Sequence, residues 1–282
     1  MREGHRRGSS HRDLADRAAR ASDARRRNDE EPLIFGFHAV EAALANPQRV
    51  IRKLLLTDNA ERRLHDSLTA RQIAHERVLP RDLDRRLGPD TVHQGALIEA
   101  APLPEPTLAE LAENAAGRPL IVLDQVTDPH NVGAILRSAA VFGAAGLIMT
   151  RRHSPPLDGA LAKSASGALE IVPVALVQNL ARGLADLKEQ HFTIIGLDGD
   201  ATERLEDTSW PELVALVLGA EGKGLRQLTR ESCDRLVRVA TDGAYASLNV
   251  SNAAAVALHW AAAGRLGMLR ADPATAAVRS RT

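Results

Sequence analysis

Three short stretches of this sequence combine polar side chains with glycines in patterns that could bind a ligand and carry chemistry. Residues 131–137 read NVGAILR, residues 218–225 read LGAEGKGL, and residues 247–251 read SLNVS. Together they offer the guanidinium of Arg137, the carboxylate of Glu221, amides and hydroxyls. Such groups can hold phosphates and orient hydroxyls, because guanidinium groups form charge-assisted hydrogen bonds and amides both donate and accept.

Each stretch taken alone also has a purely structural interpretation. Asn131, and the Ser and Asn residues before residue 250, suit helix N-caps. Glycines at a strand end bring the backbone close to a ligand or supply positive φ, but a surface turn with a solvated Glu221–Lys223 pair has the same pattern. Arg137 lies about one and two-thirds helical turns after Asn131. Because its neighbours are apolar, the Arg137 side chain either extends to the surface or points its guanidinium at an anion.

The flanking residues predict the elements that must position these stretches. Strands are expected at 120–124, 146–150, 171–177, 192–197, 214–218 and 236–239. Helices are expected between them, including 132–142 and an alanine-rich helix at 250–265. Strands that alternate with helices predict an α/β fold with a parallel sheet covered on both faces. Ligands of such sheets bind beyond the carboxyl ends of the strands, where the stretch 218–225 falls.

A smaller α/β domain is expected in front of this sheet, because shorter strand and helix patterns alternate there as well. Three prolines within residues 101–106 predict a semi-rigid connection after it. The chain is therefore divided into a mixed-charge arm, a small α/β domain, a linker, a main domain and a tail, at residues 1–31, 32–100, 101–118, 119–265 and 266–282.

Composition excludes several classes of protein. Of 282 residues, 44% are hydrophobic, which suits a folded core. No apolar run reaches the roughly 18–20 residues that span a bilayer, so no membrane partner is expected. The N-terminus is polar rather than signal-like, so a cytoplasmic protein is expected. One cysteine, Cys233, excludes a disulfide scaffold and a Cys-cluster zinc site, so no metal is expected. The dinucleotide fingerprint G-x-G-x-x-G is missing after the first main-domain strand.

Charge is unevenly distributed although 36 basic residues balance 36 acidic ones. Residues 106–264 hold 13 basic and 18 acidic residues, a net charge of −5, whereas residues 32–105 hold ten of each sign. A nucleic-acid partner would therefore be held by local clusters. The candidate clusters are Arg62-Arg63, Arg85-Arg86 and Arg151-Arg152, the last at the end of a predicted strand, and each pair taken alone also suits a solvated surface.

In this order and spacing, the three stretches resemble the SpoU branch of the SPOUT RNA methyltransferases, which includes the TrmH- and RlmB-like proteins. The resemblance spans about residues 119–264, and residues 163–168 (KSASGA) resemble a further family segment. Residues 34–40 (IFGFHAV) and 93–95 (HQG) resemble the ribosomal-protein-like RNA-binding domain of the RlmB subgroup.

The resemblance implies a trefoil-knotted α/β fold, a homodimer and S-adenosylmethionine as cofactor. The many alanines of the last helix are consistent with a helix that passes through a loop. The implied cofactor contacts, mainly through the backbone, are Gly219, Val239, Leu248, Leu197 and Gly199. This chain departs from the family at Val239-Ala240-Thr241, where Ile-Pro-Met is usual. The loss of that proline is expected to loosen the loop.

The reaction implied by the resemblance is 2′-O-methylation of a ribose in RNA, with a guanosine of 23S ribosomal RNA as the expected target. Arg137 is the implied catalytic residue. Because a guanidinium keeps its proton in ordinary protein settings, we expect Arg137 to anchor phosphate and favour the developing alkoxide. The residues expected to orient the ribose, the loop and Arg137 are Asn131, Glu221, Ser247 and Asn249. The alternatives are a transfer-RNA ribose methyltransferase and a non-catalytic RNA-binding ribosome-assembly factor.

Overall fold

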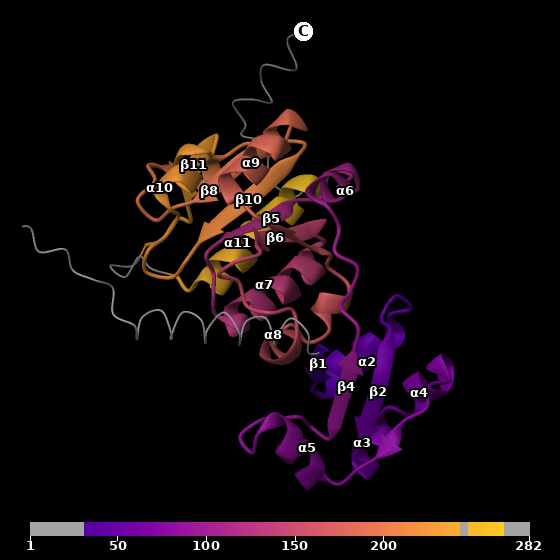
Figure 1. Cartoon of the computed structure of the whole chain (residues 1–282). Helices are drawn as coiled ribbons and strands as arrows, with labels where there is room; N and C mark the ends of the chain where they lie inside the picture. Colours follow the sequence, from indigo (N-terminus) through magenta and orange to yellow (C-terminus); the bar gives the residue numbers. More distant parts are fainter. Residues whose placement is uncertain (1–30, 243–247, 268–282) are drawn as a thin grey trace, which may run out of the picture.

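The computed structural model describes residues 31–242 and 248–267, and its first domain is a four-stranded sheet with short helices (Figure 1). The elements are β1 (Leu33–Phe35), α2 (Phe37–Ala45), β2 (Ile51–Leu56), α3 (Asp58–Arg63), α4 (His65–Arg71), β3 (Glu76–Arg77), α5 (Pro80–Leu87) and β4 (Ala96–Ala100). The strand order is β1-β4-β2-β3. Strand β4 is antiparallel to both neighbours, whereas β2 and β3 run parallel.

The second domain contains a seven-stranded sheet in the order β7-β6-β5-β10-β8-β11-β9, in which all neighbouring strands run parallel. The first half comprises α6 (Leu108–Glu113), β5 (Leu120–Asp124), α7 (Pro129–Phe142), β6 (Gly146–Thr150), α8 (Gly159–Ser164), the 3₁₀ turn η1 (Ala168–Glu170), β7 (Val174–Val177) and α9 (Leu180–Glu189). The second half comprises β8 (Thr193–Leu197), β9 (Glu203–Arg204), η2 (Leu205–Asp207), β10 (Val214–Gly219), α10 (Gln227–Glu231), β11 (Arg235–Arg238) and α11 (Val250–Arg265).

The apolar strands of this sheet are buried on both faces. In β5, Ile121 and Leu123 pack in the core that includes α7 and α11, whereas Leu120 and Val122 pack in the core that includes α6 and α9. This division follows from the two-residue period of a strand, which points neighbouring side chains to opposite faces. The expectation of a parallel sheet covered on both faces is confirmed (Figure 1).

The last helix, α11, packs along α7 and also contacts β10. Ala254, Ala257 and Ala261 on its inner side are fully buried. Small side chains let two helix backbones approach closely, which explains why this helix is rich in alanine. The threading of α11 through a knot stays a prediction.

The segment 101–118, expected to be a linker, contains the helix α6. Thr107 and Glu110 form a reciprocal N-cap: the Thr107 hydroxyl accepts from the Glu110 N–H at 3.2 Å, and the Glu110 carboxylate accepts from the Thr107 N–H at 2.7 Å. The pattern T-x-x-E was a readable signal for this helix start. Nearly all of the expected arm and tail lies outside the described residues.

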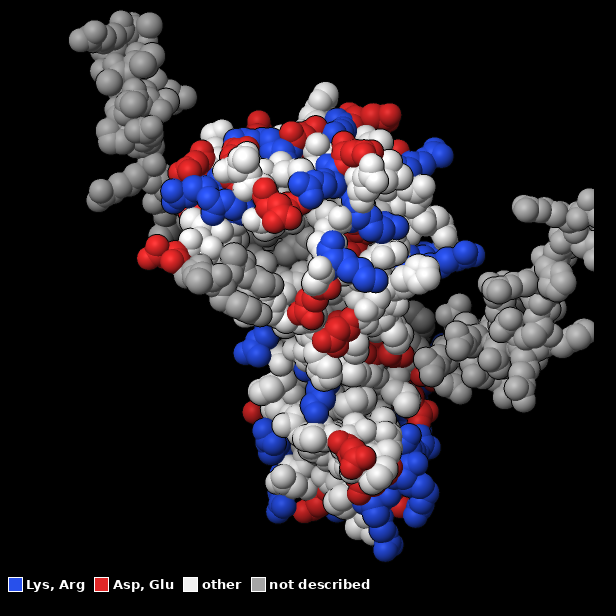
Figure 2. All heavy atoms as spheres, turned by 90° about the vertical axis from the view of Figure 1, so that its left-hand side faces the viewer, with Lys and Arg blue, Asp and Glu red and all other residues white. Residues whose placement is uncertain are grey.

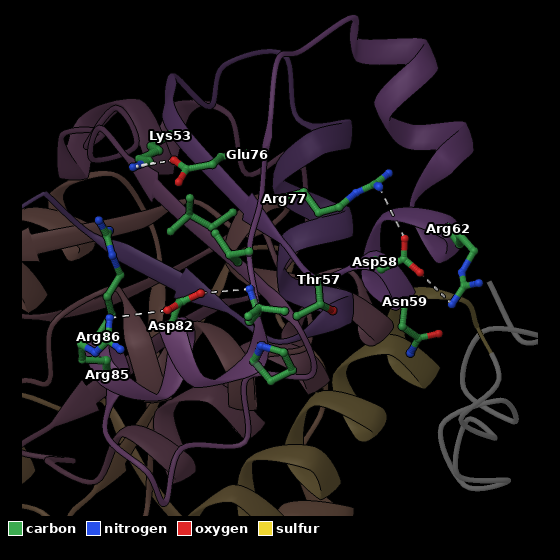
Figure 3. A pocket seen from close by; sticks show the side chains of 14 residues that line it. Lys53, Thr57, Asp58, Asn59, Arg62, Glu76, Arg77, Asp82, Arg85 and Arg86 are labelled. Atoms are coloured by element: carbon green, nitrogen blue, oxygen red, sulfur yellow. Dashed lines mark hydrogen bonds and ion pairs between the residues drawn. The ribbon is translucent and has the colours of Figure 1, made fainter.

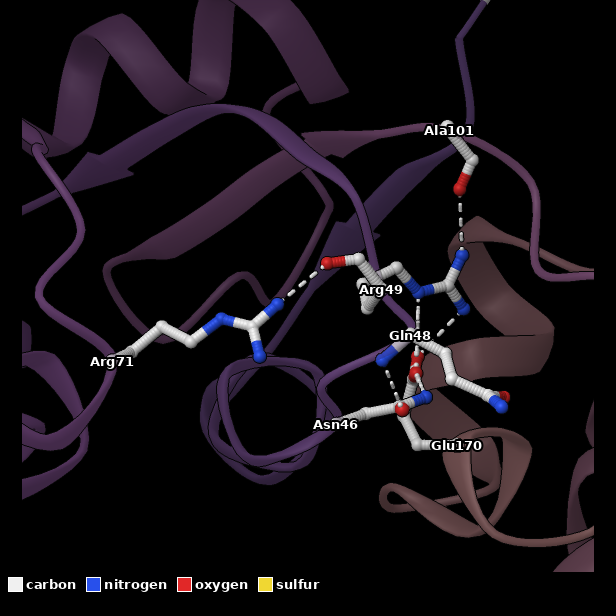
Figure 4. A network of polar contacts seen from close by, with 6 residues as sticks. All are labelled: Asn46, Gln48, Arg49, Arg71, Ala101 and Glu170. Carbon is white, nitrogen blue, oxygen red and sulfur yellow. Dashed lines mark hydrogen bonds and ion pairs between the residues drawn. The ribbon is translucent and has the colours of Figure 1, made fainter.

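A buried ion pair joins the two domains (Figure 4). The Arg49 guanidinium donates to Glu170 at 2.6 Å, and the two side chains are 2% and 4% exposed. Asn46 donates to the second Glu170 oxygen at 2.8 Å, and Arg49 also donates to the Ala101 carbonyl at 2.9 Å. Arg71 donates to the Arg49 carbonyl at 2.8 Å. The bonds to Glu170 tie the loop after α2 to η1 of the second domain.

Candidate active site

The stretch 131–137 forms the first part of α7. Asp128, not Asn131, is the N-cap of this helix, and its carboxylate accepts from the His130 N–H at 3.0 Å. Pro129 occupies the first helical position, which suits a residue that has a fixed φ and no N–H. The purely structural interpretation of Asn131 as the N-cap is therefore wrong. Asn131 lies in the first turn with only 8% of its surface exposed, and its amide is available to other elements.

The stretch 218–225 forms a turn that folds back against the end of β10. A Cβ added to Gly219 would lie 2.1 Å from the carbonyl carbon of Gly224, so no side chain fits at this position. The Gly224 N–H donates to the Ala220 carbonyl at 2.8 Å. Gly222 and Gly224 have φ angles of 73° and 64°, in the left-handed region that favours glycine. The glycine pattern therefore reflects this turn, which places Glu221 at the carboxyl edge of the sheet.

Three side chains from three distant segments meet at this edge. Asn131 donates to Glu221 Oε1 at 3.1 Å, and Asn249 donates to Asn131 Oδ1 at 3.0 Å. Asn249 also donates to Glu221 Oε1. The Asn249 side-chain oxygen accepts from the Ser251 N–H at 2.8 Å and so caps α11. We call these three residues the Asn131–Glu221–Asn249 cluster; Ser247, predicted with them, lies outside the described residues.

A cavity of about 310 Å³ borders this cluster. Asn131 and Glu221 line it together with Asp128, His153 and Lys223. His153 follows β6, so the cavity collects side chains from beyond β5, β6 and β10. This placement agrees with the general position of ligand sites in parallel sheets.

Arg137 lies apart from this cavity. It is exposed on α7, does not line the cavity, and forms no ion pair or hydrogen bond with any residue in the described ranges. Val141 lies four residues later, hence on the same side of the helix, and is 72% exposed. The guanidinium is therefore available to a partner other than the residues that the structure describes.

Four of the five predicted cofactor contacts lie at or directly after the ends of strands that are neighbours in the sheet. Strands β10, β8 and β11 lie side by side. Their carboxyl ends carry the predicted contacts Gly219, Leu197, Gly199 and Val239. Leu248, which precedes α11, is 42% exposed. A Cβ added to Gly199 would meet no atom within 4 Å, so its backbone borders open space.

The segment that departs from the family at Ala240 has its own anchor. The Ala240 N–H donates to both oxygens of the Glu206 carboxylate, each at 3.2 Å. A proline at this position has no N–H and could not form these bonds. The hydrogen bonds to Glu206 therefore hold the backbone next to Val239.

Comparison with known families decides the relationship of the chain. The model of the SpoU rRNA Methylase family matches residues 118–259. A second model, described as RNA 2′-O ribose methyltransferase substrate binding, matches residues 33–106. The chain belongs to the SpoU methyltransferase family.

Relatives of this SpoU methyltransferase align with both of its domains. A 23S rRNA (guanosine-2′-O-)-methyltransferase RlmB of Ralstonia nicotianae is 42% identical over 231 residues, which cover 80% of this chain and 93% of that protein. The RlmB protein of Haemophilus influenzae is 40% identical over 242 residues, 83% of this chain and 98% of that protein. The solved structure of the SpoU methyltransferase AviRb from Streptomyces viridochromogenes has a TM-score of 0.72 and 24% identity, and the match covers 86% of this chain and 93% of AviRb. The structural likeness to AviRb supports the fold of this chain.

The basic residues predicted to bind RNA in this SpoU methyltransferase have different surroundings. Arg151 forms an ion pair with Glu105 of the interdomain segment and is 45% exposed, whereas Arg152 is exposed and forms no side-chain ion pair or hydrogen bond among the described residues. Arg63 lies 3.8 Å above the Phe37 ring. Arg62 forms an ion pair with Asp58 at 3.1 Å and is 72% exposed. On the face in Figure 2, basic and acidic side chains are interspersed over the upper domain, and basic ones gather at the lower edges of the first domain.

Sequence reasoning missed one ion pair that supports the site. Asp124, the fully buried last residue of β5, accepts from the Arg226 N–H at 2.9 Å and from Arg226 Nε at 2.6 Å. These bonds fix the chain directly after the Gly219–Leu225 turn. An aspartate at the end of an apolar strand was the available signal, because a buried carboxylate needs a partner.

Cys233 is not placed for nucleophilic chemistry. Burial raises the pKa of its thiol to about 12, and the thiol donates to the Thr229 carbonyl at 3.3 Å. A thiol with so high a pKa is not a thiolate near neutral pH. Within residues 31–242 and 248–267, no group of three or more His, Cys, Asp or Glu side chains could hold a metal ion, and no helix is long and apolar enough to cross a bilayer.

Proposed function

We propose that this chain transfers a methyl group from S-adenosylmethionine to the ribose 2′-hydroxyl of a guanosine in 23S ribosomal RNA. The observation that carries the proposal is the 42% identity to the Ralstonia nicotianae RlmB protein, which extends over 80% of the chain and so includes the first domain. The Asn131–Glu221–Asn249 cluster supports it, because it unites all three of the stretches with polar chemistry.

The loops at the carboxyl ends of β8, β10 and β11 fit the cofactor. A related structure, AviRb, was solved in complex with AdoMet. In this chain the backbone at Gly199 borders open space, Val239 packs against the core, and the apolar Leu248 is exposed. We assign cofactor binding to Gly219, Leu197, Gly199, Val239 and Leu248, mainly through backbone groups and apolar contacts. When bound, the cofactor supplies an electrophilic methyl group on a positively charged sulfur.

The chain's own residues position the ribose and stabilise charge. Glu221 Oε1 accepts the bonds from both asparagines, and Glu221 Oε2 has no hydrogen bond among the described residues. Oε2 is therefore free to accept the proton of a ribose 2′-hydroxyl. Arg137 lies apart from the cavity and its guanidinium has no partner among the described residues; we propose that it holds the phosphate next to this ribose and favours the negative charge that develops on the 2′-oxygen. Ser247 stays a predicted orienting residue.

The target can be tested with RNA from a strain in which this gene is deleted. The purified full-length chain is incubated with radiolabelled S-adenosylmethionine and either 23S ribosomal RNA or transfer RNA, and ribose methylation is mapped by primer extension at low nucleotide concentration. We expect one methylated guanosine in 23S ribosomal RNA. With that substrate, we expect the protein to act in the cytoplasm, where ribosomes are assembled.

Two other outcomes would replace this proposal. Methylation of transfer RNA alone would support a transfer-RNA ribose methyltransferase. RNA binding without turnover, together with no cofactor binding in calorimetry, would support a non-catalytic ribosome-assembly factor. The Asn131–Glu221–Asn249 cluster argues against the second outcome, because a protein without turnover has no need to keep a carboxylate fixed by two amides.

We also propose that two chains form a homodimer through the exposed sides of α7 and α11. These packed helices expose Val141 and Val256, and Leu266 directly follows α11 with 64% exposure. Arg137 shares the exposed side of α7 with Val141, so a two-fold contact there would place Arg137 at the interface. Light scattering at micromolar concentration and physiological salt should give twice the chain mass of 30.3 kDa. A mass of one chain would contradict the dimer.

A further inference from the structure

The first domain contains a cavity of about 810 Å³, and no residue of the stretches 131–137, 218–225 and 247–251 lines it (Figure 3). It lies where the parallel strands β2 and β3 end, between α3 and α5. The volume is within the range of about 300–1,000 Å³ that is typical of ligand sites. We call it the β2–β3 cavity. The cavity and the Asn131–Glu221–Asn249 cluster belong to different domains, so the cavity is separate from the candidate active site.

The β2–β3 cavity gathers the positive charge of its domain. Its lining includes five basic residues and three acidic ones, a net charge of +2. Residues 32–105 hold ten of each sign, so the rest of this domain carries five basic and seven acidic residues, a net charge of −2. The five basic residues come from four separate elements: Lys53, Arg62, Arg77, Arg85 and Arg86.

The arginines at the rim can exchange their present partners for an anion. Arg62 and Arg85 are 72% and 76% exposed and pair with Asp58 and Asp82 at 3.1 and 3.5 Å. Exposed ion pairs of this kind contribute little to stability. A guanidinium has five N–H donors, of which each of these contacts uses one. A phosphate can therefore bind at either rim without the loss of a strong interaction.

The space between the rims suits an unpaired nucleotide. Figure 3 shows Arg85 and Arg86 on one side, Arg62 and Arg77 on the other, and Thr57 and Asn59 between them. Leu79 offers an apolar surface that is 52% exposed. The Asn59 amide has no hydrogen-bond partner among the described residues. Cations on two sides, with an apolar surface and a free amide between, match consecutive phosphates and the base between them.

We propose that the β2–β3 cavity binds an unpaired nucleotide of the substrate RNA, with Arg62 and Arg85 holding the phosphates on its two sides. The inference rests on the proposed function, which supplies RNA as the substrate. Unpaired bases can turn into a protein cavity and present their edges, whereas the bases of a duplex cannot. The cavity thus gives the first domain a means to select a loop or bulge.

The test compares two double variants of the full chain. Arg62→Ala/Arg85→Ala removes one cation from each rim. Arg52→Ala/Arg81→Ala removes the same charge from exposed residues of the same domain that do not line the cavity. Binding to a single-stranded oligoribonucleotide and to 23S ribosomal RNA is measured at several salt concentrations, with cofactor binding and urea unfolding as checks on the fold.

Arg62→Ala/Arg85→Ala, the cavity variant, should bind both RNAs at least about tenfold more weakly than the parent. Its salt slope should fall by about 1.4, which corresponds to two phosphate contacts on a single strand, and cofactor affinity should not change. The control variant should keep most of the parent's affinity. Equal affinities and slopes for the two variants would overturn the proposal.

A second variant reports on the nucleotide rather than the phosphates. Leu79→Glu places a carboxylate at a position that is already half exposed, and should weaken RNA binding without loss of the fold. Unchanged binding by this variant would also contradict the cavity site. If the parent methylates RNA but neither Arg62→Ala/Arg85→Ala nor Leu79→Glu differs from it in RNA binding, this inference fails and the proposed function stands. If the parent binds no RNA, the proposed function fails as well.

Discussion

Arg137 and Glu221 are both exposed and both are proposed to contact the ribose-phosphate substrate, but of the two only Glu221 has side-chain hydrogen bonds among the described residues. Glu221 is held through one oxygen by two amides, so its free oxygen has a defined direction. Arg137 is exposed and has no partner among the described residues, so its guanidinium is ordered only when something binds to it. A fixed acceptor and an adaptable cation suit a hydroxyl of defined position and a phosphate that arrives with the RNA.

Replacement of Arg137 with Ala should lower methyl transfer by about 10²–10³-fold, because a group that stabilises developing negative charge is removed. Cofactor affinity should stay within a few-fold of the parent. Arg137→Lys should also lose methyl transfer, because the single ammonium charge of lysine does not reproduce the two parallel hydrogen bonds of a guanidinium. Single-turnover transfer and calorimetry measure the two effects. Near-normal turnover of Arg137→Ala would remove this residue from the mechanism.

Replacement of Gly219 with Ala should displace the turn that follows β10, because the new Cβ would lie 2.1 Å from the carbonyl carbon of Gly224. We expect cofactor affinity to fall at least about tenfold, which corresponds to about 1.4 kcal/mol. Gly183→Ala is the matched control, since a Cβ there would meet its nearest atoms at an ordinary 3.6 Å. Parent-like binding by Gly219→Ala would show that the turn does not shape the cofactor site.

At the scale of elements, α8 lies between the helix that carries Asn131 and the first domain. Gly133 of α7 packs directly on α8, where an added Cβ would lie 2.6 Å from Ser164 Cβ and 2.8 Å from the Leu161 carbonyl oxygen. Gly167, which follows α8, packs on α2 of the first domain, where an added Cβ would lie 2.6 Å from Ala42 Cβ. The stretch 163–168 therefore contacts both α7 and α2 of the first domain.

Replacement of Gly133 with Ala should lower the free energy of unfolding by about 1–3 kcal/mol, because the extra methyl is forced into packed space between α7 and α8. Alanine is the better helix former by about 1 kcal/mol, so a loss of stability cannot come from helix propensity. Urea unfolding measures the change. Gly183→Ala, also inside a helix, should be neutral or stabilising, and a Gly133→Ala variant as stable as Gly183→Ala would contradict close packing of α7 on α8.

At the scale of the whole molecule, the Arg49–Glu170 pair fixes one domain on the other. Both side chains are almost completely buried, and Asn46 and the Ala101 carbonyl satisfy further hydrogen-bonding groups. A buried ion pair is costly to break from one side, because the remaining charge has neither water nor a partner. The pair therefore holds the loop after α2 of the first domain against η1 of the second domain.

Arg49→Ala should destabilise the protein by about 3–5 kcal/mol, because Glu170 would be left as an unpaired buried charge. The double variant Arg49→Met/Glu170→Met should recover much of this loss. Arg52→Ala is the control: Arg52 is 58% exposed and pairs with the half-exposed Glu31, so the change should be within about 0.5 kcal/mol. Urea unfolding measures all three variants, and equal stability of Arg49→Ala and Arg52→Ala would contradict the role of the pair.

Local patterns in the sequence were enough to predict much of the fold. The run LIVLD predicted a buried strand, and β5 occupies those same five residues. The expected helix 250–265 is α11. These predictions hold because the period of the apolar residues is a local property that each element carries within itself. The start of α7 was predicted wrongly, because Asp128, Pro129 and Asn131 are all suitable near a helix start, and only the backbone shows that Asp128 is the cap.

The tertiary structure alone decided which polar groups meet. Asn131 and Glu221 are 90 positions apart, Asp124 and Arg226 are 102 apart, and Arg49 and Glu170 are 121 apart. Residue types and spacing marked Asn131 and Glu221 as candidates, but they did not single out Asp124 or the Arg49–Glu170 pair. No local pattern specifies such pairs, because the partners come together only when parallel strands place their carboxyl ends at one edge and when two domains bury a shared surface.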